Sequence, residues 1–452
     1  MRTRSGELEF SNKPKRFKMN FLLDSDSYKY SHFAQYPKNE GLFSYIEARA
    51  GDEVKFFGLQ YIIKKMLTKM YSKNDIKEAK EIVTAHGLPF NEKGFEELRT
   101  LGYFPLKIKA VKEGGVYPVQ IPLVSIQSTD ARFGWLVGFI ETALLRLWYP
   151  TTVATNSYKI KKVVLKYTKN TDFKVHDMGS RGVSCQENAL IGGMAHLLNF
   201  KGTDTVISLL GARKYYNADI AGFSIPAMEH STVTSWENEK DAFANMLSVY
   251  AKEGVLLACV SDSYDYKNAV DKIWGRELKE SVQKSGAIIT IRPDSGDPIE
   301  LIPYTLESLA GNFGFTNAPD GKLLNSVRII WSDGMNINII DEILSNITKS
   351  GWSPDNVAFG IGGVLLQKVT RDMYSFAYKA SAIKIDGTWR GICKSPVTNP
   401  IKKSKSGRIG AEFKDGKYIV RDIDKDKFEN ALETIYLNGD LIKEYKFEDI
   451  AN

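Results

Sequence analysis

Residues 287–296, AIITIRPDSG, form a short apolar run that ends in Arg292, Asp294 and Gly296. Short apolar runs bounded by polar and glycine residues are typical of buried strands in parallel sheets. The residues that follow such a strand lie at the carboxyl edge of the sheet, where parallel α/β enzymes place their functional groups. This segment therefore predicts one βα unit with a functional loop.

The same pattern recurs about every 30 residues, which is the length of a βα unit. We therefore expect a TIM-like, barrel-like parallel α/β domain over residues 161–384. An open, doubly wound sheet is the competing architecture. Functional-looking residues follow every run, whereas an open sheet concentrates them at its switch point, so the barrel is favoured. The other apolar runs are 175–177, 223–225, 255–260, 327–331 and 357–359.

The two ends of the chain show the apolar and polar alternation of antiparallel strands. Residues 105–129 alternate in this way, and Asp386-Gly387, Asp415-Gly416 and Asn438-Gly439 have the composition of hairpin turns. We therefore expect a second, β-rich α+β domain built from residues 21–160 and 385–452. Residues 1–20 are expected to be a flexible extension.

Composition narrows the class of protein. The net charge is +7, from 61 basic and 54 acidic residues, and the cations are dispersed, which favours anionic small molecules over nucleic acid. Cys185, Cys259 and Cys393 lack the spacing of a metal site or a disulfide framework. The apolar stretch 133–149 is too short and too charged to span a membrane. We expect a cytoplasmic protein without nucleic-acid or membrane partners.

Four charged residues after these runs are candidates for chemistry. His230 lies beside a carboxylate just after run 223–225, and a polar loop histidine is the alternative interpretation. Asp262, Asp294 and Asp333 follow three other runs. Buried together, such carboxylates need hydroxyls, a histidine or a metal ion as partners. Ribose diols and Mg²⁺ both meet that need.

Glycines and arginines at other strand ends suit phosphate groups. Residues 360–363, GIGG, precede a helical pattern, where backbone N–H groups bind phosphate; a plain βα turn is the alternative. Arg181 and Arg292 match phosphate geometry, unless Asp177 or Asp294 pairs with them. Asp204 is either a helix N-cap or an acceptor for a substrate N–H. Further candidate cations are Arg371, Lys379, Lys402, Lys403, Lys405 and Arg408. The set indicates a phosphorylated sugar with more than one phosphate.

From Asp24 to its C-terminus the chain resembles the nicotinamide phosphoribosyltransferase family, a group of type II phosphoribosyltransferases. The resemblance is collinear and rests on many short motifs. In order, these are Asp26–Lys29, Tyr36-Pro37, Gly58–Tyr61, Trp148–Pro150, Ala154–Ser157, Arg181–Ser184, Asn199–Thr205, Glu229–Thr232, Ser261–Asp265, Arg292–Gly296 and Leu365–Lys368.

The resemblance implies an activity and an assembly. Nicotinamide and phosphoribosyl pyrophosphate would give nicotinamide mononucleotide and pyrophosphate, a step of NAD salvage. ATP would phosphorylate His230 to drive the reaction, and Mg²⁺ would accompany the pyrophosphate, with no separate protein metal site. The protein would be a homodimer whose subunits share the active sites.

The resemblance also implies residue roles. Asp262 would orient His230, and Asp294 and Asp333 would hold the ribose beside Ser332. Asp204 would accept the carboxamide N–H of nicotinamide. Arg181 and Arg292 would contact the pyrophosphate or the base. Gly362 and Gly363 would bind the 5′-phosphate, together with Arg371, Lys379 and Lys402 from the partner subunit. Met178 and the partner's Tyr28 would enclose the nicotinamide ring.

Three positions depart from the family pattern. Met178 stands where the family usually has phenylalanine, at a cost of about 1 kcal/mol in ring stacking. Ser332 replaces a glycine and Ala377 replaces a serine. Two alternatives remain. A nicotinate phosphoribosyltransferase is disfavoured because Asp204 would repel an acid substrate. A non-catalytic binding protein would be expected to lack some of the residues that the reaction needs, and they are present.

Overall fold

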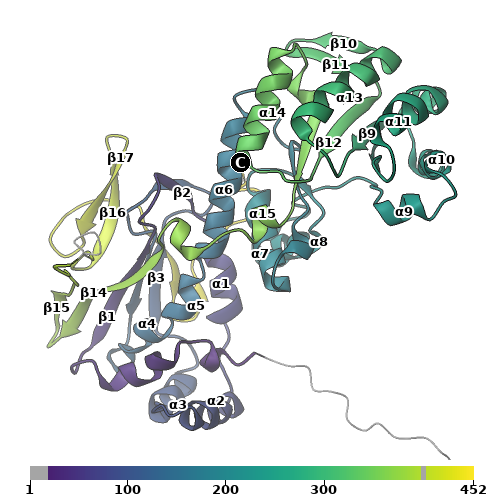
Figure 1. Ribbon diagram of the computed structural model, residues 1–452. Coiled ribbons are helices and arrows are strands. Elements are labelled where there is room, and N and C mark those ends of the chain that lie inside the picture. Colours follow the sequence, from purple (N-terminus) through teal and green to yellow (C-terminus); the bar gives the residue numbers. More distant parts are fainter. Residues whose placement is uncertain (1–18, 399–403, 452) are drawn as a thin grey trace, which may run out of the picture.

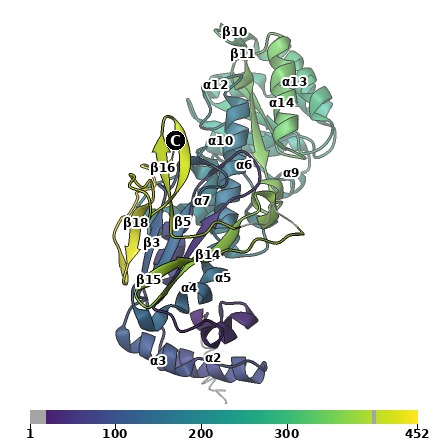
Figure 2. The same ribbon diagram turned by 90° about the vertical axis from the view of Figure 1, so that its left-hand side faces the viewer.

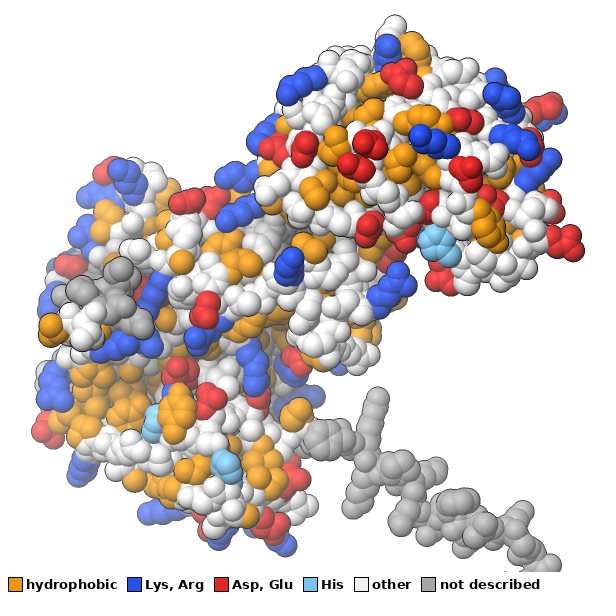
Figure 3. Space-filling view, in the orientation of Figure 1, with side chains coloured by type: hydrophobic (Ala, Val, Ile, Leu, Met, Phe, Trp, Pro, Cys, Tyr) orange, Lys and Arg blue, Asp and Glu red, His pale blue; other side chains and the backbone are white. Residues whose placement is uncertain are grey.

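The computed structural model of the protein describes residues 19–398 and 404–451. Figure 1 shows two lobes, one β-rich and one α/β, each built around its own sheet. In this part of the chain, no helix is long and apolar enough to cross a membrane. Basic and acidic side chains are interspersed over both lobes on the face drawn in Figure 3.

A seven-stranded antiparallel sheet forms the β-rich lobe. The central strand β1 is buried along its whole length. Helices α2 (Lys73–Ala85) and α3 (Glu92–Leu101) cover one end of this lobe in Figures 1 and 2. The order of strands is β15 (Thr388–Gly391), β14 (Ala377–Ile385), β1 (Gly41–Glu47), β5 (Val124–Ser128), β3 (Leu106–Ala110), β18 (Glu433–Leu437) and β19 (Asp440–Leu441).

The three expected hairpin turns are confirmed. Asp386, Asp415 and Asn438 have positive φ angles of 45°, 52° and 50°, and each is followed by a glycine with positive φ. Two adjacent residues with positive φ form the turn that matches strand twist. The turns connect β14 to β15, β16 (Ile409–Lys414) to β17 (Lys417–Asp422), and β18 to β19.

Two domain boundaries differ from those expected from the sequence. Strand β14 pairs with β1, so the β-rich sheet begins again at Ala377 rather than at 385. The sequence placed this boundary at residue 385 because the Asp386-Gly387 turn is the recognisable local pattern there, whereas the pairing of β14 with β1 is not encoded locally. At the other end, Asn20 is buried, and its side chain donates to the Asp75 carbonyl at 2.8 Å. Residues 1–18 of the expected extension lie outside the described residues.

The α/β lobe contains a six-stranded parallel sheet, and the expected barrel-like parallel domain is confirmed. Five of the six apolar runs form strands of this sheet. Adjacent strands are β7 (Gly202–Thr203), β6 (Val175–Asp177), β13 (Val357–Ile361), β12 (Val327–Trp331), β9 (Ile288–Arg292) and β8 (Leu256–Val260).

Segment 223–228, which begins with the sixth apolar run, bridges the two edge strands β7 and β8. Phe223 forms a parallel bridge with Gly202, and Ala227 forms one with Ala258. The backbone N–H of Thr203 donates to the Phe223 carbonyl at 3.0 Å, and the Met228 N–H donates to the Ala258 carbonyl at 2.9 Å. In a doubly wound sheet the edge strands β7 and β8 would lie apart, so these contacts favour the barrel-like architecture.

Helices after the strands surround the sheet (Figure 1). The segment after β8 contains a π-helix, Ala269–Glu277. A hairpin of β10 (Phe315–Ala318) and β11 (Gly321–Leu324) precedes β12. The helices are α7 (Gln186–Leu197), α8 (Val206–Tyr216), α9 (His230–Thr234), α10 (Glu239–Tyr250), α11 (Tyr266–Asn268), α12 (Lys279–Ser285), α13 (Pro298–Phe313), α14 (Ile337–Lys349) and α15 (Gly363–Leu366).

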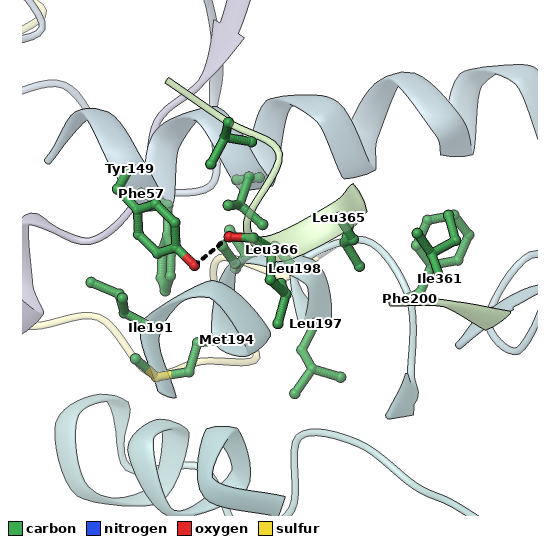
Figure 4. Packing of buried hydrophobic residues seen from close by; sticks show 14 of the residues in the cluster. Phe57, Tyr149, Ile191, Met194, Leu197, Leu198, Phe200, Ile361, Leu365 and Leu366 are labelled. Carbon is green, nitrogen blue, oxygen red and sulfur yellow. Dashed lines mark hydrogen bonds between the residues drawn. The ribbon is translucent and has the colours of Figure 1, made fainter. Parts of the chain in front are cut away.

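Helix α6 (Trp148–Val164) joins the two lobes. It packs against β2 (Glu53–Lys55) on one side and against α7 and α14 on the other. Figure 4 shows the apolar side chains packed here, where the Tyr149 hydroxyl donates to the Leu366 carbonyl at 2.8 Å. The buried Glu113 adds a polar anchor, since it accepts from the Gly58 and Gln60 N–H groups and from the Tyr216 hydroxyl. One apolar cluster therefore extends through both lobes.

Candidate active site

Three expected site residues meet at the carboxyl edge of the barrel. His230 is the first residue of α9, Asp262 follows β8, and Asp294 follows β9. The His230 Nε2 atom lies 3.8 Å from Asp262 Oδ1 and 3.6 Å from Asp294 Oδ2. The imidazole is 45% exposed and the Asp262 side chain only 5%. A reachable histidine therefore lies over a buried carboxylate.

The two oxygens of Asp262 have different surroundings. Oδ2 accepts from the Asp294 backbone N–H at 2.9 Å and from the Ser295 hydroxyl at 2.6 Å. Oδ1 is buried and has no hydrogen-bond partner within the described residues. A buried acceptor without a partner is costly, so Oδ1 calls for a donor from His230 or a cation from a ligand. The His230 Nδ1 atom lies 3.2 Å from the Ser263 hydroxyl.

Asp294 connects the histidine to the next strand. Its Oδ1 accepts from the Ser332 hydroxyl at 2.9 Å, while its Oδ2 faces His230. Ser332 directly follows β12. Asp333, the next residue, is exposed, and its carbonyl accepts from the Trp331 indole at 2.9 Å. Asp333 thus follows Ser332 at the same edge, and its carboxylate forms no hydrogen bond or salt bridge within the described residues.

Asp204 lies after β7 and is held by two residues that sequence reasoning missed. Its Oδ1 accepts from His176 Nε2 at 2.8 Å and from the Ser224 hydroxyl at 2.6 Å. Burial raises the pKa of the Asp204 carboxyl, but these hydrogen bonds outweigh burial and keep that pKa below its usual value. The helix-cap interpretation is wrong, because Thr205 occupies the N-cap position of α8. The sequence did not indicate a functional role for His176, because this residue lies within a short apolar run.

Met178 lies over a glycine of β13. A methyl group added to Gly360 would lie 2.5 Å from Met178 Sδ, closer than atoms can approach. The Met178 backbone N–H donates to the Ile361 carbonyl at 2.9 Å, which continues the β6–β13 pairing. The glycine at 360 is therefore required for Met178 to occupy this position.

The glycine-rich loop after β13 packs against the loop that carries Arg181. A methyl group added to Gly182 would lie 3.0 Å from the Gly363 Cα atom, so the two backbones are in close contact. The expected helix is only the four-residue α15, too short to supply a useful positive field. Phosphate binding at Gly362 and Gly363 would thus depend on loop N–H groups. The side chain of Arg181 is exposed beside them.

Neither arginine forms the structural ion pair that was the alternative. In residues 19–398 and 404–451, no salt bridge joins Arg181 or Arg292 to a carboxylate. The Arg292 Nε is buried without a hydrogen-bond partner there. Its charge acts on Asp204, whose pKa it helps to lower. Arg292 therefore has an unused donor near the site.

The expected partner-subunit residues lie away from this edge. Tyr28, in the 3-10 helix Ser27–Ala34, is 56% exposed. Lys379 lies on β14, and its pKa is lowered by burial and by nearby cations, Arg49 among them. Figure 1 shows β14 and α9 at opposite sides of the molecule.

The other expected cations differ in their surroundings. Arg371 is exposed in the 3-10 helix Arg371–Met373. Lys402 and Lys403 lie outside the described residues. Lys405 pairs with Glu47, and Arg408 pairs with Asp424, so both have structural partners.

Comparisons with known proteins agree with this arrangement. Residues 173–440 match the model of the nicotinate phosphoribosyltransferase (NAPRTase) family, and residues 20–108 match the nicotinamide phosphoribosyltransferase N-terminal domain. A nicotinamide phosphoribosyltransferase of Xanthomonas campestris is 44% identical over 95% of this chain and 97% of its own length. The chain belongs to the nicotinamide phosphoribosyltransferase family. A relative of the same name from Acinetobacter baylyi is 30% identical over 96% of this chain and 97% of its own.

Solved structures share the fold at lower identity. Nicotinate-nucleotide pyrophosphorylase of Pyrococcus furiosus superposes with a TM-score of 0.64 at 17% identity, covering 97% of this chain and 96% of its own. Human nicotinic acid phosphoribosyltransferase gives 0.59 at 17% identity, covering 94% and 92%. The overall fold of this family member is thus shared with both of these structures.

Proposed function

We propose that this member of the nicotinamide phosphoribosyltransferase family condenses nicotinamide with 5-phosphoribosyl 1-pyrophosphate in NAD salvage. The observation that carries the choice of substrate is Asp204. Two donors hold one of its oxygens and keep it anionic, which leaves the other oxygen for the carboxamide N–H. A carboxylate in this position repels nicotinate.

The reaction needs charge stabilisation more than proton transfer. The bond from the ribose C1 atom to the pyrophosphate oxygen breaks, and the ring nitrogen of nicotinamide forms the new bond to C1. That nitrogen carries no proton, so no general base is needed. The carboxylates of Asp294 and Asp333 would face the cationic ribose of the transition state, and Arg181 and Arg292 would face the departing pyrophosphate.

His230 supplies the energetic coupling in this proposal. One imidazole N–H would donate a hydrogen bond to Asp262, whose Oδ1 has no other partner within the described residues. The other nitrogen would then attack the terminal phosphorus of ATP, forming the N–P bond as the P–O bond to ADP breaks. The exposed imidazole and the adjacent buried carboxylate support this role.

Mg²⁺ would enter with the pyrophosphate, where it neutralises the charge of the leaving group. In the described part of the chain no three His, Cys, Asp or Glu side chains form a metal cage. A magnesium ion that is bound mainly through phosphates needs only one or two protein carboxylates. The partly exposed Asp294 carboxylate beside His230 fits that requirement.

A homodimer would complete each site. Lys379 lies on β14, on the other side of the molecule from α9, and Tyr28 and Arg371 lie in 3-10 helices outside the parallel sheet, yet these residues carry the ring and cations that the barrel edge needs. From a second copy, the partner's Tyr28 would stack on nicotinamide, opposite Met178. Sedimentation of the purified protein should therefore give a dimer. An active monomer would contradict the shared site.

Product analysis tests the function directly. The purified protein is incubated with phosphoribosyl pyrophosphate, Mg²⁺ and either nicotinamide or nicotinate, with and without ATP. We expect nicotinamide mononucleotide and pyrophosphate, with a lower nicotinamide KM when ATP is present. Faster turnover of nicotinate would favour the acid-specific enzyme, and no product with either base would favour a binding protein.

A His230→Ala variant tests the coupling separately. We expect basal synthesis to continue and the effect of ATP on KM to disappear, because the phosphoryl acceptor is lost. The matched control is His86→Ala, a histidine of the β-rich lobe that contacts Ser27. An unchanged ATP effect in His230→Ala would contradict the role of this histidine.

A further inference from the structure

Two of the residues that depart from the family pattern lie side by side over Gly360. Strand β12 pairs Trp331 with Phe359, and β13 pairs Gly360 with His176, so Ser332 is the neighbour of Gly360 across the sheet. A methyl group built on Gly360 would lie 2.5 Å from Met178 Sδ and 2.9 Å from Ser332 Cβ. Both side chains therefore occupy the same small space above one glycine.

Ser332 cannot leave this space without a cost. Its hydroxyl donates to Asp294 Oδ1 at 2.9 Å, and the other oxygen of Asp294 lies 3.6 Å from His230 Nε2. A glycine at position 332 would open the space above Gly360 but would leave Asp294 without this donor. The hydrogen bond thus fixes both the rotamer of Ser332 and the direction of the Asp294 carboxylate.

We propose that Met178 and Ser332 form a coupled pair that sets the base side of the active site. Ser332 positions Asp294, and its side chain restricts position 178 to a narrow, flexible residue. A thioether chain adjusts to an irregular gap, whereas a phenyl ring is rigid and wider. A ring at 178 would compete with Ser332 Cβ for the space above Gly360 and would be pushed toward nicotinamide. This inference rests on the proposed function, because it assumes that nicotinamide lies against residue 178.

A double-mutant cycle measures the coupling. The wild type, Met178→Phe, Ser332→Gly and the double variant are compared by their nicotinamide KM. We expect Met178→Phe alone to raise this KM about tenfold, a typical effect of overpacking a close-packed site. We expect the double variant to return to within about threefold of the wild type, since the two changes are not additive when side chains share space.

Two further variants separate crowding from hydrogen bonding. Ser332→Ala keeps the Cβ atom and removes the hydroxyl, so it should not rescue Met178→Phe. Both Ser332→Ala and Ser332→Gly should lower kcat/KM for phosphoribosyl pyrophosphate about fivefold, the effect of one lost hydrogen bond. Ser350→Gly, at an exposed serine after α14, is the matched control and should neither rescue Met178→Phe nor change either constant. Thermal unfolding of each variant checks that the fold is retained.

The outcomes distinguish this inference from the proposed function. If the wild type forms no nicotinamide mononucleotide, the proposed function fails whatever the variants do. If the wild type is active and Ser332→Gly does not rescue Met178→Phe, the coupling is refuted and the function stands. Rescue by Ser332→Ala to the same extent would also refute it, because the Cβ atom would then not be the obstacle.

Discussion

Replacing Asp204 with asparagine should change the base preference of the enzyme. The carboxylate accepts from His176 and Ser224 through one oxygen, and an amide oxygen can keep both contacts. The oxygen that faces the substrate is replaced by an NH2 group, so the negative charge is lost and a hydrogen-bond acceptor becomes a donor. The variant therefore tests the charge and the acceptor role of Asp204 with little change in shape.

The magnitude follows from the exposure of the group. The Asp204 side chain is 46% exposed, so its hydrogen bond to nicotinamide belongs at the lower end of the range for charged acceptors, about 1.5 kcal/mol. That loss lowers kcat/KM for nicotinamide about tenfold. Relief of repulsion should raise kcat/KM for nicotinate by a comparable, about tenfold, factor. The ratio of the two constants should thus fall about 100-fold.

Steady-state assays with each base provide the measurement. Asp172→Asn is the matched control. The Asp172 side chain precedes β6, is also 46% exposed and pairs with Lys201. The control should leave the ratio unchanged. An unchanged ratio in Asp204→Asn would refute charge repulsion as the source of selectivity. Because the hydrogen bonds hold the pKa of Asp204 below its usual value, wild-type selectivity should persist at neutral pH and decline only as pH falls through that lowered pKa.

Three further predictions concern packing, the buried anchor and pH. Gly360→Ala should raise the nicotinamide KM about tenfold, because its methyl group would lie 2.9 Å from Ser332 Cβ and would displace the flexible Met178 thioether; an unchanged KM would be inconsistent with the packing described. Glu113→Ala should lower the free energy of unfolding in urea by about 3 kcal/mol, since three buried donors lose their acceptor, while KM stays constant; a smaller loss than for an exposed glutamate would contradict this. Burial, with a smaller contribution from Lys161, lowers the pKa of Lys55 from 10.5 to about 8. Between those values the unfolded chain binds more protons than the folded one, so stability rises with pH there. Lys55→Met should reduce that rise, and an identical pH dependence in both proteins would refute it.

Local sequence pattern determined much of the architecture. Apolar runs followed by glycine and polar residues marked the parallel strands, because burial on both faces of a strand is encoded within a few residues. Paired turn residues such as Asn438-Gly439 marked the hairpins, because their backbone angles are a local property. His230 was identified for the same reason, as a residue of the polar segment after such a run. The family resemblance then supplied the expected partners.

Tertiary structure alone decided which side chains meet. Segment 223–228 closes the barrel through bridges to β7 and β8, which its own sequence does not specify. His176 reaches Asp204, and Met178 and Ser332 both lie over Gly360, only because strand register places distant segments side by side. Register depends on the packing of the whole sheet, since a shift of one residue would reverse the face of every side chain. The sequence by itself determined the strands and the candidate charges, and the closed sheet determined their geometry.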